Sequence, residues 1–528
     1  MKGFEHIEEH QIRNEKLEKL IALKIDPYAV GFQPTHDSKE LITKYDPIKI
    51  GESKEAEQGT TPFVAVAGRL MLFRAMGKNA FAHIQDKSGR IQIMFNKEST
   101  EVVGFTPDDE FSTPLKFIEK LIDLGDIIGV EGHLFHTKKG ELTVFVKKMT
   151  LLCKSLLPLP DKHSGLSDKE MRYRKRWLDL ISNSEVQKTF SDRSRILKLV
   201  RHHLEELNFT EVETPVLGSI YGGAEARPFT TELHALNQEM FLRISLEISL
   251  KKLLVGGMDR IFEIGKVFRN EGIDRTHNPE FTLLEAYAAY WDYNDMMHLT
   301  ETLYEKIALT LHETTQISFF QPETQTNIIV DFKTPWKRIS MKESIKEYAN
   351  LDCDQLSDDE MRKILLKHGM EEKELSNSSR GLLIAHLFET LVEHQLIQPH
   401  FITDYPIETT PLCRPHRTLS SQGIIERFEG FVLGGEICNA YTELNDPVLQ
   451  QKLLEDQVER RLKGDEEASP YDEEFVEALA QGMPPTGGLG IGIDRLVMLF
   501  TNTHSIRDVI FFPWMKPKTH MEAATPEG

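Results

Sequence analysis

Acidic, basic and aromatic side chains occur together inside apolar runs at one place in the chain. Residues 267–287 read VFRNEGIDRTHNPEFTLLEAY, which is two apolar runs separated by a polar turn. Alternation along an extended strand places Phe281, Glu285 and Tyr287 on one face. A buried carboxylate requires a positive or hydrogen-bonding partner. Either Arg269 pairs with Glu285 across the predicted hairpin, or a cationic ligand supplies the missing charge.

A second run, GGEICNAYTELN, contains another acid in an apolar setting. In an extended strand Asn439, Tyr441 and Glu443 point the same way. Two buried carboxylates cannot both be neutralised by one arginine, whereas a cationic ligand would supply the missing charge.

A third run, PTGGLGIGIDRLVMLF, combines a glycine-rich stretch with a predicted helix start near Asp494. Glycines let a backbone approach another group closely. Arg495 in the first helical turn favours an external anion. The spacing matches neither a Rossmann fingerprint nor a P-loop. The alternative is glycine-rich packing beside a surface arginine. The glycines of this run are Gly487, Gly488, Gly490 and Gly492.

Length and composition indicate a globular protein of two or three domains. The chain has 528 residues, 40% hydrophobic and 28% charged, with a net charge of −20, which argues against a general nucleic-acid binder but not against a local basic groove. The four cysteines form no CxxC pair, so we expect neither a zinc site nor a disulfide framework. No apolar stretch is long enough to span a bilayer. We therefore expect a cytoplasmic protein without membrane attachment.

The alternation of apolar and polar residues changes along the chain. Residues 8–24 have the pattern of an amphipathic helix, and from residue 63 short alternating runs separated by turns predict a small β-barrel of the OB type. Phe81 with Arg74 and Gln92 nearby favours single-stranded nucleic acid over a purely structural barrel.

The remainder predicts an α+β domain with a mostly antiparallel sheet flanked by helices. The basic run DKEMRYRKRW within the preceding linker is expected to be a solvated charge run. The predicted divisions are an N-terminal helix and linker (1–60), an OB-fold domain (61–155), a linker (156–180), the larger domain (181–516, with a helical insertion at about 338–397) and a tail (517–528).

Three of these segments resemble known motifs in their known order. FTEVETPVL resembles motif 1 of the class II aminoacyl-tRNA synthetases, FRNEGIDRTHNPEF motif 2 and GLGIGIDRLVMLF motif 3. GRLMLFRAMGKNAFAHIQDKSGRIQ resembles an anticodon-binding OB domain. From about residue 8 to 516, with ARPFTT, LLVGGMDRIFEIG and NAYTELNDP, the chain is similar to the bacterial-type lysyl-tRNA synthetases of subclass IIb.

This resemblance implies an N-terminal OB-fold barrel, a class II catalytic domain and a homodimer formed through the region around Pro215. It implies that L-lysine reacts with ATP to give lysyl-adenylate, and that lysine then passes to the 3′ end of tRNA(Lys). Positioning and charge neutralisation supply most of such catalysis.

The resemblance also implies roles for individual residues, with Arg269 and Arg495 as the catalytic arginines. Lysine would be bound by Gly223, Glu247, Arg269, Glu285, Tyr287, Asn439, Tyr441 and Glu443. ATP would be bound by Arg269, Glu271, His277, Asn278, Phe281, Glu429 and Arg495. Mg²⁺ would be held by Glu429 and Glu436, and the anticodon would be read by Arg74, Phe81, Gln92 and Glu141.

Some of these expectations conflict. A two-residue turn at Gly434–Gly435 would put Glu429 and Glu436 on the hairpin face opposite Asn439, so that one cavity requires a bulge or a different turn. Glu247 is expected on a strand. Two relatives remain as alternatives: a synthetase for aspartate or asparagine, which would require a cation where Glu285 and Glu443 lie, and a non-enzymatic binding protein.

Overall fold

The computed structural model describes residues 3–4, 6–160, 166, 168–321, 324–376, 378–463 and 468–517. The chain separates into two compact units, Met1–Gly165 and Leu166–Gly528. Part of the predicted linker and the tail from residue 518 lie outside the described residues. Within the described ranges, no helix combines the length and apolar character needed to cross a membrane.

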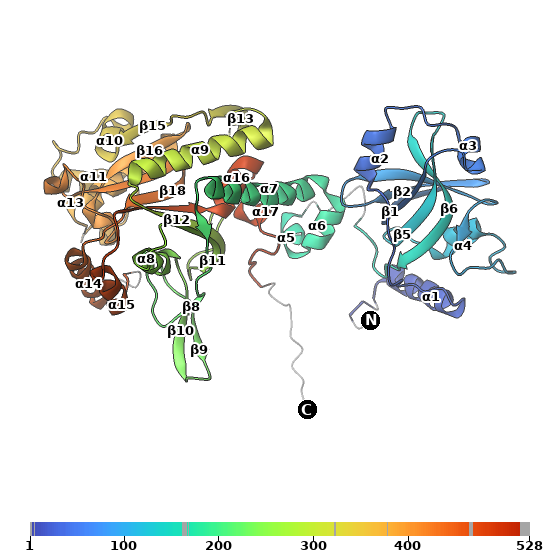
Figure 1. The fold of residues 1–528 in the computed structure, drawn as a ribbon, viewed down its shortest axis with the longest axis horizontal. Coiled ribbons are helices and arrows are strands. Elements are labelled where there is room, and N and C mark those ends of the chain that lie inside the picture. Colours follow the sequence, from blue (N-terminus) through green and yellow to red (C-terminus); the bar gives the residue numbers. More distant parts are fainter. Residues whose placement is uncertain are drawn as a thin grey trace. The chain divides into compact units, whose positions relative to one another are not determined.

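The first unit is a closed five-stranded barrel (Figure 1). The strands follow the order β3-β2-β1-β5-β6, and β3 pairs with β6 to close the barrel. This confirms the predicted OB fold. Its strands are β1 (Phe63–Met76), β2 (Asn79–Gln85), β3 (Arg90–Asn96), β5 (Ile127–His136) and β6 (Leu142–Cys153), with the short β4 (Glu101–Val102) beside β6. Its helices are α1 (Glu8–Ala22), α2 (Ser38–Tyr45), α3 (Ser53–Gln58) and α4 (Pro114–Leu121).

The second unit is built on an eight-stranded sheet with the order β15-β16-β17-β18-β19-β12-β11-β7. The two outermost pairs, β15–β16 and β11–β7, are parallel, and the pairs between them are antiparallel. The predicted α+β class is thereby confirmed. The strands are β7 (Thr210–Glu211), β11 (Arg260–Phe268), β12 (Glu280–Ala289), β15 (Lys337–Ser340), β16 (His400–Pro406), β17 (Ile424–Val432), β18 (Gly435–Thr442) and β19 (Thr486–Gly492).

Helices cover one face of this sheet and leave the other face open to a cavity. Helices α7 (Ser184–Glu206), α9 (Tyr293–His312) and α16 (Ile493–Thr501) lie along the covered face (Figure 1). Leu284, Ala286 and Ala288 of β12 point into the core beneath these helices. Because side chains alternate along a strand, the odd-numbered residues of β12 face the other way.

The remaining elements surround this framework. The predicted insertion contains four α-helices and a short 3₁₀-helix with their own core, although its first residues, 338–340, belong to β15 of the main sheet. The insertion elements are α10 (Met341–Ala349), α11 (Asp358–Lys367), α12 (Glu372–Leu375), α13 (Arg380–Leu391) and η1 (Glu393–Gln395). The others are α8 (Glu247–Val255), α14 (Pro447–Leu462), α15 (Glu473–Ala480), α17 (Ile506–Val509), η2 (Ile407–Thr409), η3 (Ser420–Gln422), the strands β8 (Leu217–Gly218), β9 (Thr230–Leu233) and β10 (Gln238–Leu242), and the hairpin β13 (Gln316–Gln321) and β14 (Thr326–Asp331).

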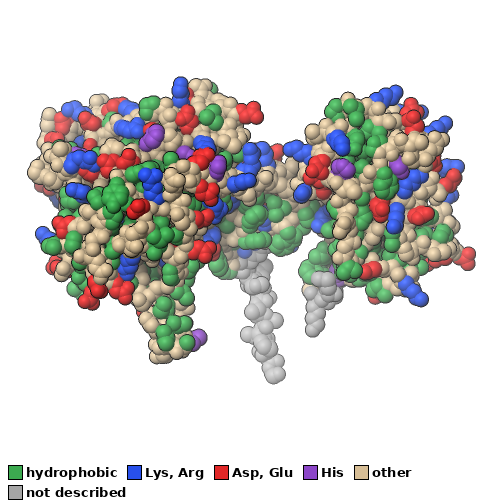
Figure 2. All heavy atoms as spheres, viewed as in Figure 1, with side chains coloured by type: hydrophobic (Ala, Val, Ile, Leu, Met, Phe, Trp, Pro, Cys, Tyr) green, Lys and Arg blue, Asp and Glu red, His purple; other side chains and the backbone are tan. Residues whose placement is uncertain are grey.

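The basic run before residue 180 is only in part the solvated charge run that was predicted, because Lys169 and Lys175 are exposed whereas Arg176 is buried. It forms α5 (Lys169–Arg174) and α6 (Arg176–Ser182). Arg176 is fully buried, donates to the carbonyl oxygens of Arg507 and Phe511 at 2.6 and 3.1 Å, and pairs with Asp179 at 2.7 Å. Figure 2 shows hydrophobic side chains gathered over these helices, where Trp177 is half exposed. Arg176 therefore belongs to the packing of the second unit.

Candidate active site

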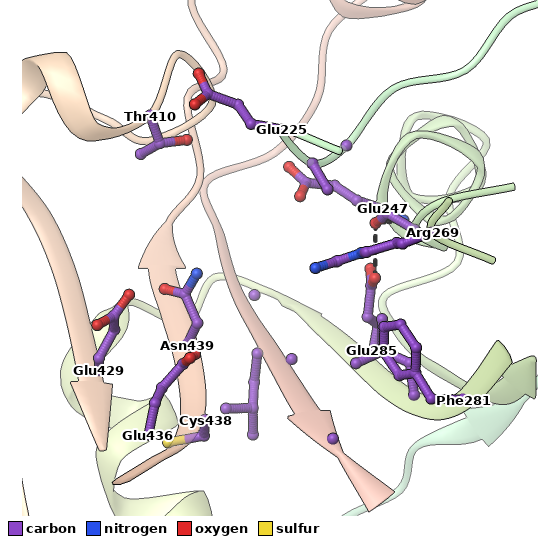
Figure 3. Close-up of a pocket in the computed structure, with 18 of the residues that line it drawn as sticks. Glu225, Glu247, Arg269, Phe281, Glu285, Thr410, Glu429, Glu436, Cys438 and Asn439 are labelled. Carbon is purple, nitrogen blue, oxygen red and sulfur yellow. Dashed lines mark hydrogen bonds between the residues drawn. The ribbon is translucent and has the colours of Figure 1, made fainter. Parts of the chain in front are cut away.

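A cavity of about 500 Å³ opens on the uncovered face of the large sheet. Every residue predicted to contact lysine, ATP or magnesium lines it. These residues are Gly223, Glu247, Arg269, Glu271, His277, Asn278, Phe281, Glu285, Tyr287, Glu429, Glu436, Asn439, Tyr441, Glu443 and Arg495. Figure 3 shows Glu247, Arg269 and Glu285 on one side of the cavity and Glu429, Glu436 and Asn439 on the other.

Strand alternation explains how distant segments deliver these side chains to one place. Ala440 of β18 and Leu489 of β19 point into the helix-covered core. Their neighbours Asn439, Tyr441 and Gly488 therefore face the cavity. The absence of a side chain at Gly488 is necessary, because a Cβ there would overlap with Oε1 of Glu443 and lie 2.6 Å from Cε1 of Tyr287.

The β17–β18 hairpin resolves the conflict over Glu429 and Glu436. Its two turn residues are Leu433 and Gly434, with φ of 55° and 73°, so the predicted turn at Gly434–Gly435 is wrong by one residue. The pairing of the two strands then contains a bulge. Glu429 lies opposite Asn439 and Phe431 lies opposite Glu436, so β18 has one residue more than β17 over this stretch. The extra residue on β18 re-aims the strand, and both glutamates reach the cavity that Asn439 also lines.

Glu285 has no positive partner among the described residues. Its carboxylate is buried and accepts hydrogen bonds from Ser245 Oγ at 2.7 Å, the Leu246 amide at 3.0 Å and the Tyr287 hydroxyl at 2.9 Å. Burial, together with the nearby Glu247 carboxylate, raises the pKa of Glu285 to about 7. These neutral donors hold the carboxylate in place without cancelling its charge.

Arg269 does not form the ion pair with Glu285 that was one of the two interpretations of this hairpin. Its Nε donates to the carbonyl oxygen of Ile244 at 3.3 Å. Its guanidinium lies over the ring of Phe281, 5.3 Å from the ring centroid. The planar donor group of Arg269 therefore remains available to an anion in the cavity.

Sequence reasoning missed a buried lysine at the amino-acid end of the cavity. Glu247 is the first residue of helix α8, which corrects the expectation that it lies on a strand. Lys251 follows one turn later with no exposed surface. Its Nζ lies 2.5 Å from Glu247 Oε1 and 2.5 Å from Glu443 Oε2. The spacing Glu-x-x-x-Lys is typical of a helical ion pair, and this spacing could have indicated Lys251 from the sequence.

Arg427 was also missed and lines the cavity. It donates to Glu429 Oε1 at 2.5 Å and to Asn439 Oδ1 at 3.2 Å. Its guanidinium stands over the ring of Tyr405, 4.7 Å from the centroid. In ERFEGF, alternation puts Arg427 and Glu429 on one face, so the strand pattern could have indicated it.

The opposite end of the cavity combines a helix start with basic groups. Asp494 is buried and accepts from Arg193 at 2.6 Å and from the Thr282 amide at 2.7 Å, which anchors the first turn of α16. Arg495, the next residue, lies 3.3 Å from Glu436 Oε2 and 3.2 Å from His277 Nε2. Arg269 and Arg495 thus provide cations at separate points of the wall, as binding of a polyanion requires.

A second group of predicted residues lies on the outer face of the OB barrel. Arg74 is opposite Phe81 across β1 and β2. Gln92 donates to Glu141 at 2.7 Å, and His83, which sequence reasoning missed, contacts the same carboxylate at 3.0 Å. Phe81 and His83 point outward because Ala80, Ala82 and Ile84 fill the barrel interior.

Comparisons with known proteins agree with this division of the chain. Residues 168–516 match the family model described as tRNA synthetases class II (D, K and N), and residues 64–152 match the OB-fold nucleic acid binding domain. A lysine–tRNA ligase of Chlamydia caviae is 55% identical over 506 residues, covering 96% of each chain. That of Nostoc punctiforme is 46% identical over 510 residues, which cover 96% of this chain and 87% of the relative. That of Oceanobacillus iheyensis is 45% identical over 516 residues, which cover 97% of this chain and 100% of the relative.

The close approach at Gly488 yields a stability prediction. We expect Gly488→Ala to lower the free energy of unfolding by about 1–3 kcal/mol, because the new methyl group displaces Glu443 and Tyr287. Gly490→Ala is the matched control, since its Cβ would meet only the Asn439 carbonyl oxygen at 3.7 Å. Thermal unfolding measures both variants. Equal melting temperatures for the two would contradict the tight packing at Gly488.

Proposed function

The chain belongs to the class II tRNA synthetases and is a lysine–tRNA ligase, and we propose that the cavity on its large sheet is the site of lysine activation. In this reaction lysine and ATP form lysyl-adenylate and release diphosphate. The terminal ribose of tRNA(Lys) then accepts the lysyl group and AMP leaves.

The observation that carries this proposal is the buried carboxylate of Glu285, which is held only by neutral donors. A ligand ammonium group supplies the charge that the protein does not place there. Glu443 nearby adds a second carboxylate to the same end of the cavity. An aspartate substrate would instead require a cation for its side chain, and the neutral amide of asparagine would leave the acids without a counter-charge, so the acids favour lysine.

We propose that the substrate lies with its side chain between the β12 and β18 residues. Its ε-ammonium contacts Glu285, Tyr287 and Glu443, and Tyr441 closes the same wall. Its α-ammonium lies at Glu247 beside Gly223. Its carboxylate meets Arg269 and Asn439. Support comes from the position of all these groups on the wall of one cavity.

The nucleotide occupies the other part of the cavity in this proposal. Adenine stacks on Phe281, and Arg495 covers the opposite side of the nucleotide. Arg269 bridges the lysine carboxylate and the α-phosphate, where a planar fork suits two anions. The carboxylate oxygen attacks the α-phosphorus, and the bond to the diphosphate breaks. The remaining predicted ATP contacts are Glu271, His277, Asn278 and Glu429.

The residues at the phosphate end suit a magnesium ion that arrives with the nucleotide. Burial and the charges of Glu429 and Glu436 raise the pKa of the nearby Glu393 to about 7. Within the described ranges no cluster of three or more metal-binding side chains is present. Glu429 and Glu436 would therefore supply oxygen ligands, while phosphates and water complete the shell. The ion would neutralise charge on the phosphates.

The partners of the enzyme follow from its other surfaces. We propose that Arg74, Phe81, Gln92 and Glu141 contact the anticodon of tRNA(Lys), since a half-buried ring on the outer face of the barrel beside polar groups suits unstacked bases. We also propose a homodimer through the segment after Pro215, where the side chains of Val216 and Leu217 remain exposed. We expect the enzyme to act in the cytoplasm.

Substitution at Glu443 tests the assignment of the ammonium end. We expect Glu443→Gln to raise the lysine KM about 10- to 100-fold, because a charge-assisted contact is lost, while the ATP KM stays within about two-fold. ATP–diphosphate exchange measures both constants. Glu474→Gln is the control, because Glu474 is an exposed partner of Lys252. Unchanged use of lysine by Glu443→Gln would refute the assignment.

The raised pKa of Glu285 predicts a pH dependence. Below pH 7 the carboxyl group of the free enzyme holds a proton and cannot pair with the ammonium group. We expect kcat/KM for lysine to rise about ten-fold between pH 6 and pH 8, as one group titrating near 7 requires. Glu285→Gln should show a smaller rise over this interval. A flat profile for the unmodified enzyme would contradict the role of Glu285.

A further inference from the structure

We propose that Lys251 is a positioning and specificity-determining residue of the lysine site: it ties Glu247 to Glu443 and neutralises one of three carboxylates, leaving two negative charges for the two ammonium groups of the substrate. This inference rests on the proposed function of the cavity. It concerns a residue that does not line the cavity and would act through two residues that do.

Lys251 is buried and held between two carboxylates. The side chain comes from α8, has no exposed surface, and places Nζ 2.5 Å from one oxygen of Glu247 and 2.5 Å from one of Glu443. The same nitrogen lies over the Phe475 ring, 5.9 Å from the ring centroid. The two carboxylate oxygens are therefore at most about 5 Å apart, a distance at which two buried like charges repel strongly without a cation between them.

The charges at this end of the cavity balance only when the substrate is included. Glu247, Glu285 and Glu443 carry up to three negative charges, and Lys251 carries one positive charge. Burial alone would lower the pKa of Lys251, but the two carboxylates outweigh burial and raise it, so its ammonium group stays charged. Two negative charges remain, and the α- and ε-ammonium groups of lysine match them.

The other cations of the cavity do not alter this balance. Arg427 lies 2.5 Å from Glu429, and Arg495 lies 3.3 Å from Glu436, so each is paired with an acid other than Glu247, Glu285 and Glu443. Arg269 is assigned to the carboxylate of the substrate. Among the described residues, Lys251 is thus the cation that pairs with Glu247 and Glu443.

Glu443 retains capacity for a ligand despite its contact with Lys251. The ion pair is short but badly directed, so that neither oxygen of Glu443 accepts a well-formed hydrogen bond within the described part of the chain. Burial raises the pKa of Glu443, and Lys251 opposes this shift only in part. An ammonium group of the substrate supplies the hydrogen bonds that are missing. Lys251 therefore holds Glu443 in place without replacing the substrate.

A cycle of substitutions separates this role from simple packing. Lys251→Met keeps the length of the side chain and removes its charge. We expect its lysine KM to rise at least about ten-fold, with the ATP KM within about two-fold. Lys252→Met is the matched control on the same helix, since Lys252 pairs at the surface with Glu474, and it should behave as the unmodified enzyme in ATP–diphosphate exchange.

The double variant Lys251→Met/Glu443→Gln removes one charge of each sign and restores the balance. We expect its lysine KM to be no higher than that of Glu443→Gln alone, because coupled residues give non-additive effects. A value ten-fold above Glu443→Gln would overturn the proposal, and so would a Lys251→Met enzyme that matches Lys252→Met. The comparison of the double variant with Glu443→Gln can still be made if the single variant Lys251→Met does not fold.

These outcomes are distinct from failure of the proposed function. If the unmodified enzyme supports no lysine-dependent exchange, the assignment of the cavity itself is wrong, and the role of Lys251 falls with it. If the unmodified enzyme uses lysine normally but the Lys251→Met enzyme behaves like the Lys252→Met control, the inference about Lys251 is refuted and the proposed function stands.

Discussion

Buried negative charge that the protein does not fully neutralise is the constraint on which the active site depends. Glu285 lies in an apolar strand with three neutral hydrogen-bond donors. Such a group destabilises the empty protein, because a buried carboxylate without a cation loses its hydration. The same cost makes the cavity selective, since a ligand that brings ammonium groups recovers this energy and a neutral ligand does not. The preference for lysine is in this view a property of the empty site.

The two-faced sheet is what makes such a site possible. Leu284, Ala286 and Ala288 of β12 anchor one face beneath α7, α9 and α16, while Glu285 and Tyr287 face the cavity. A one-residue slip in register would exchange the two sets and bury the acids among aliphatic side chains. The hydrophobic core therefore fixes the position of the charged groups.

Much of this architecture could be predicted from the sequence, and the limits have physical reasons. Alternation in TLLEAY and CNAYTEL predicted which residues share a face, because period two is a local property of a strand. A bulge was one of the two ways to bring these residues to one cavity, but its position on β18 could not be predicted, since an extra residue leaves no mark in an apolar pattern. Burial of Lys251 and Arg176 was missed because charge suggests exposure. Their near partners, Glu247 and Asp179, are equally typical of a surface helix, and the partners that bury them lie far away in the sequence.

The measurement that tests the central claim most directly is ATP–diphosphate exchange without tRNA, run with each of the twenty amino acids in turn. If the negative charge of the empty cavity is neutralised by the ammonium groups of the substrate, ATP–diphosphate exchange should occur with lysine and with no other amino acid. Exchange driven by aspartate, asparagine or a neutral amino acid would contradict the account of Glu285 and Glu443, although the fold would stand. The absence of exchange with every amino acid would contradict activation at this site in the enzyme without tRNA.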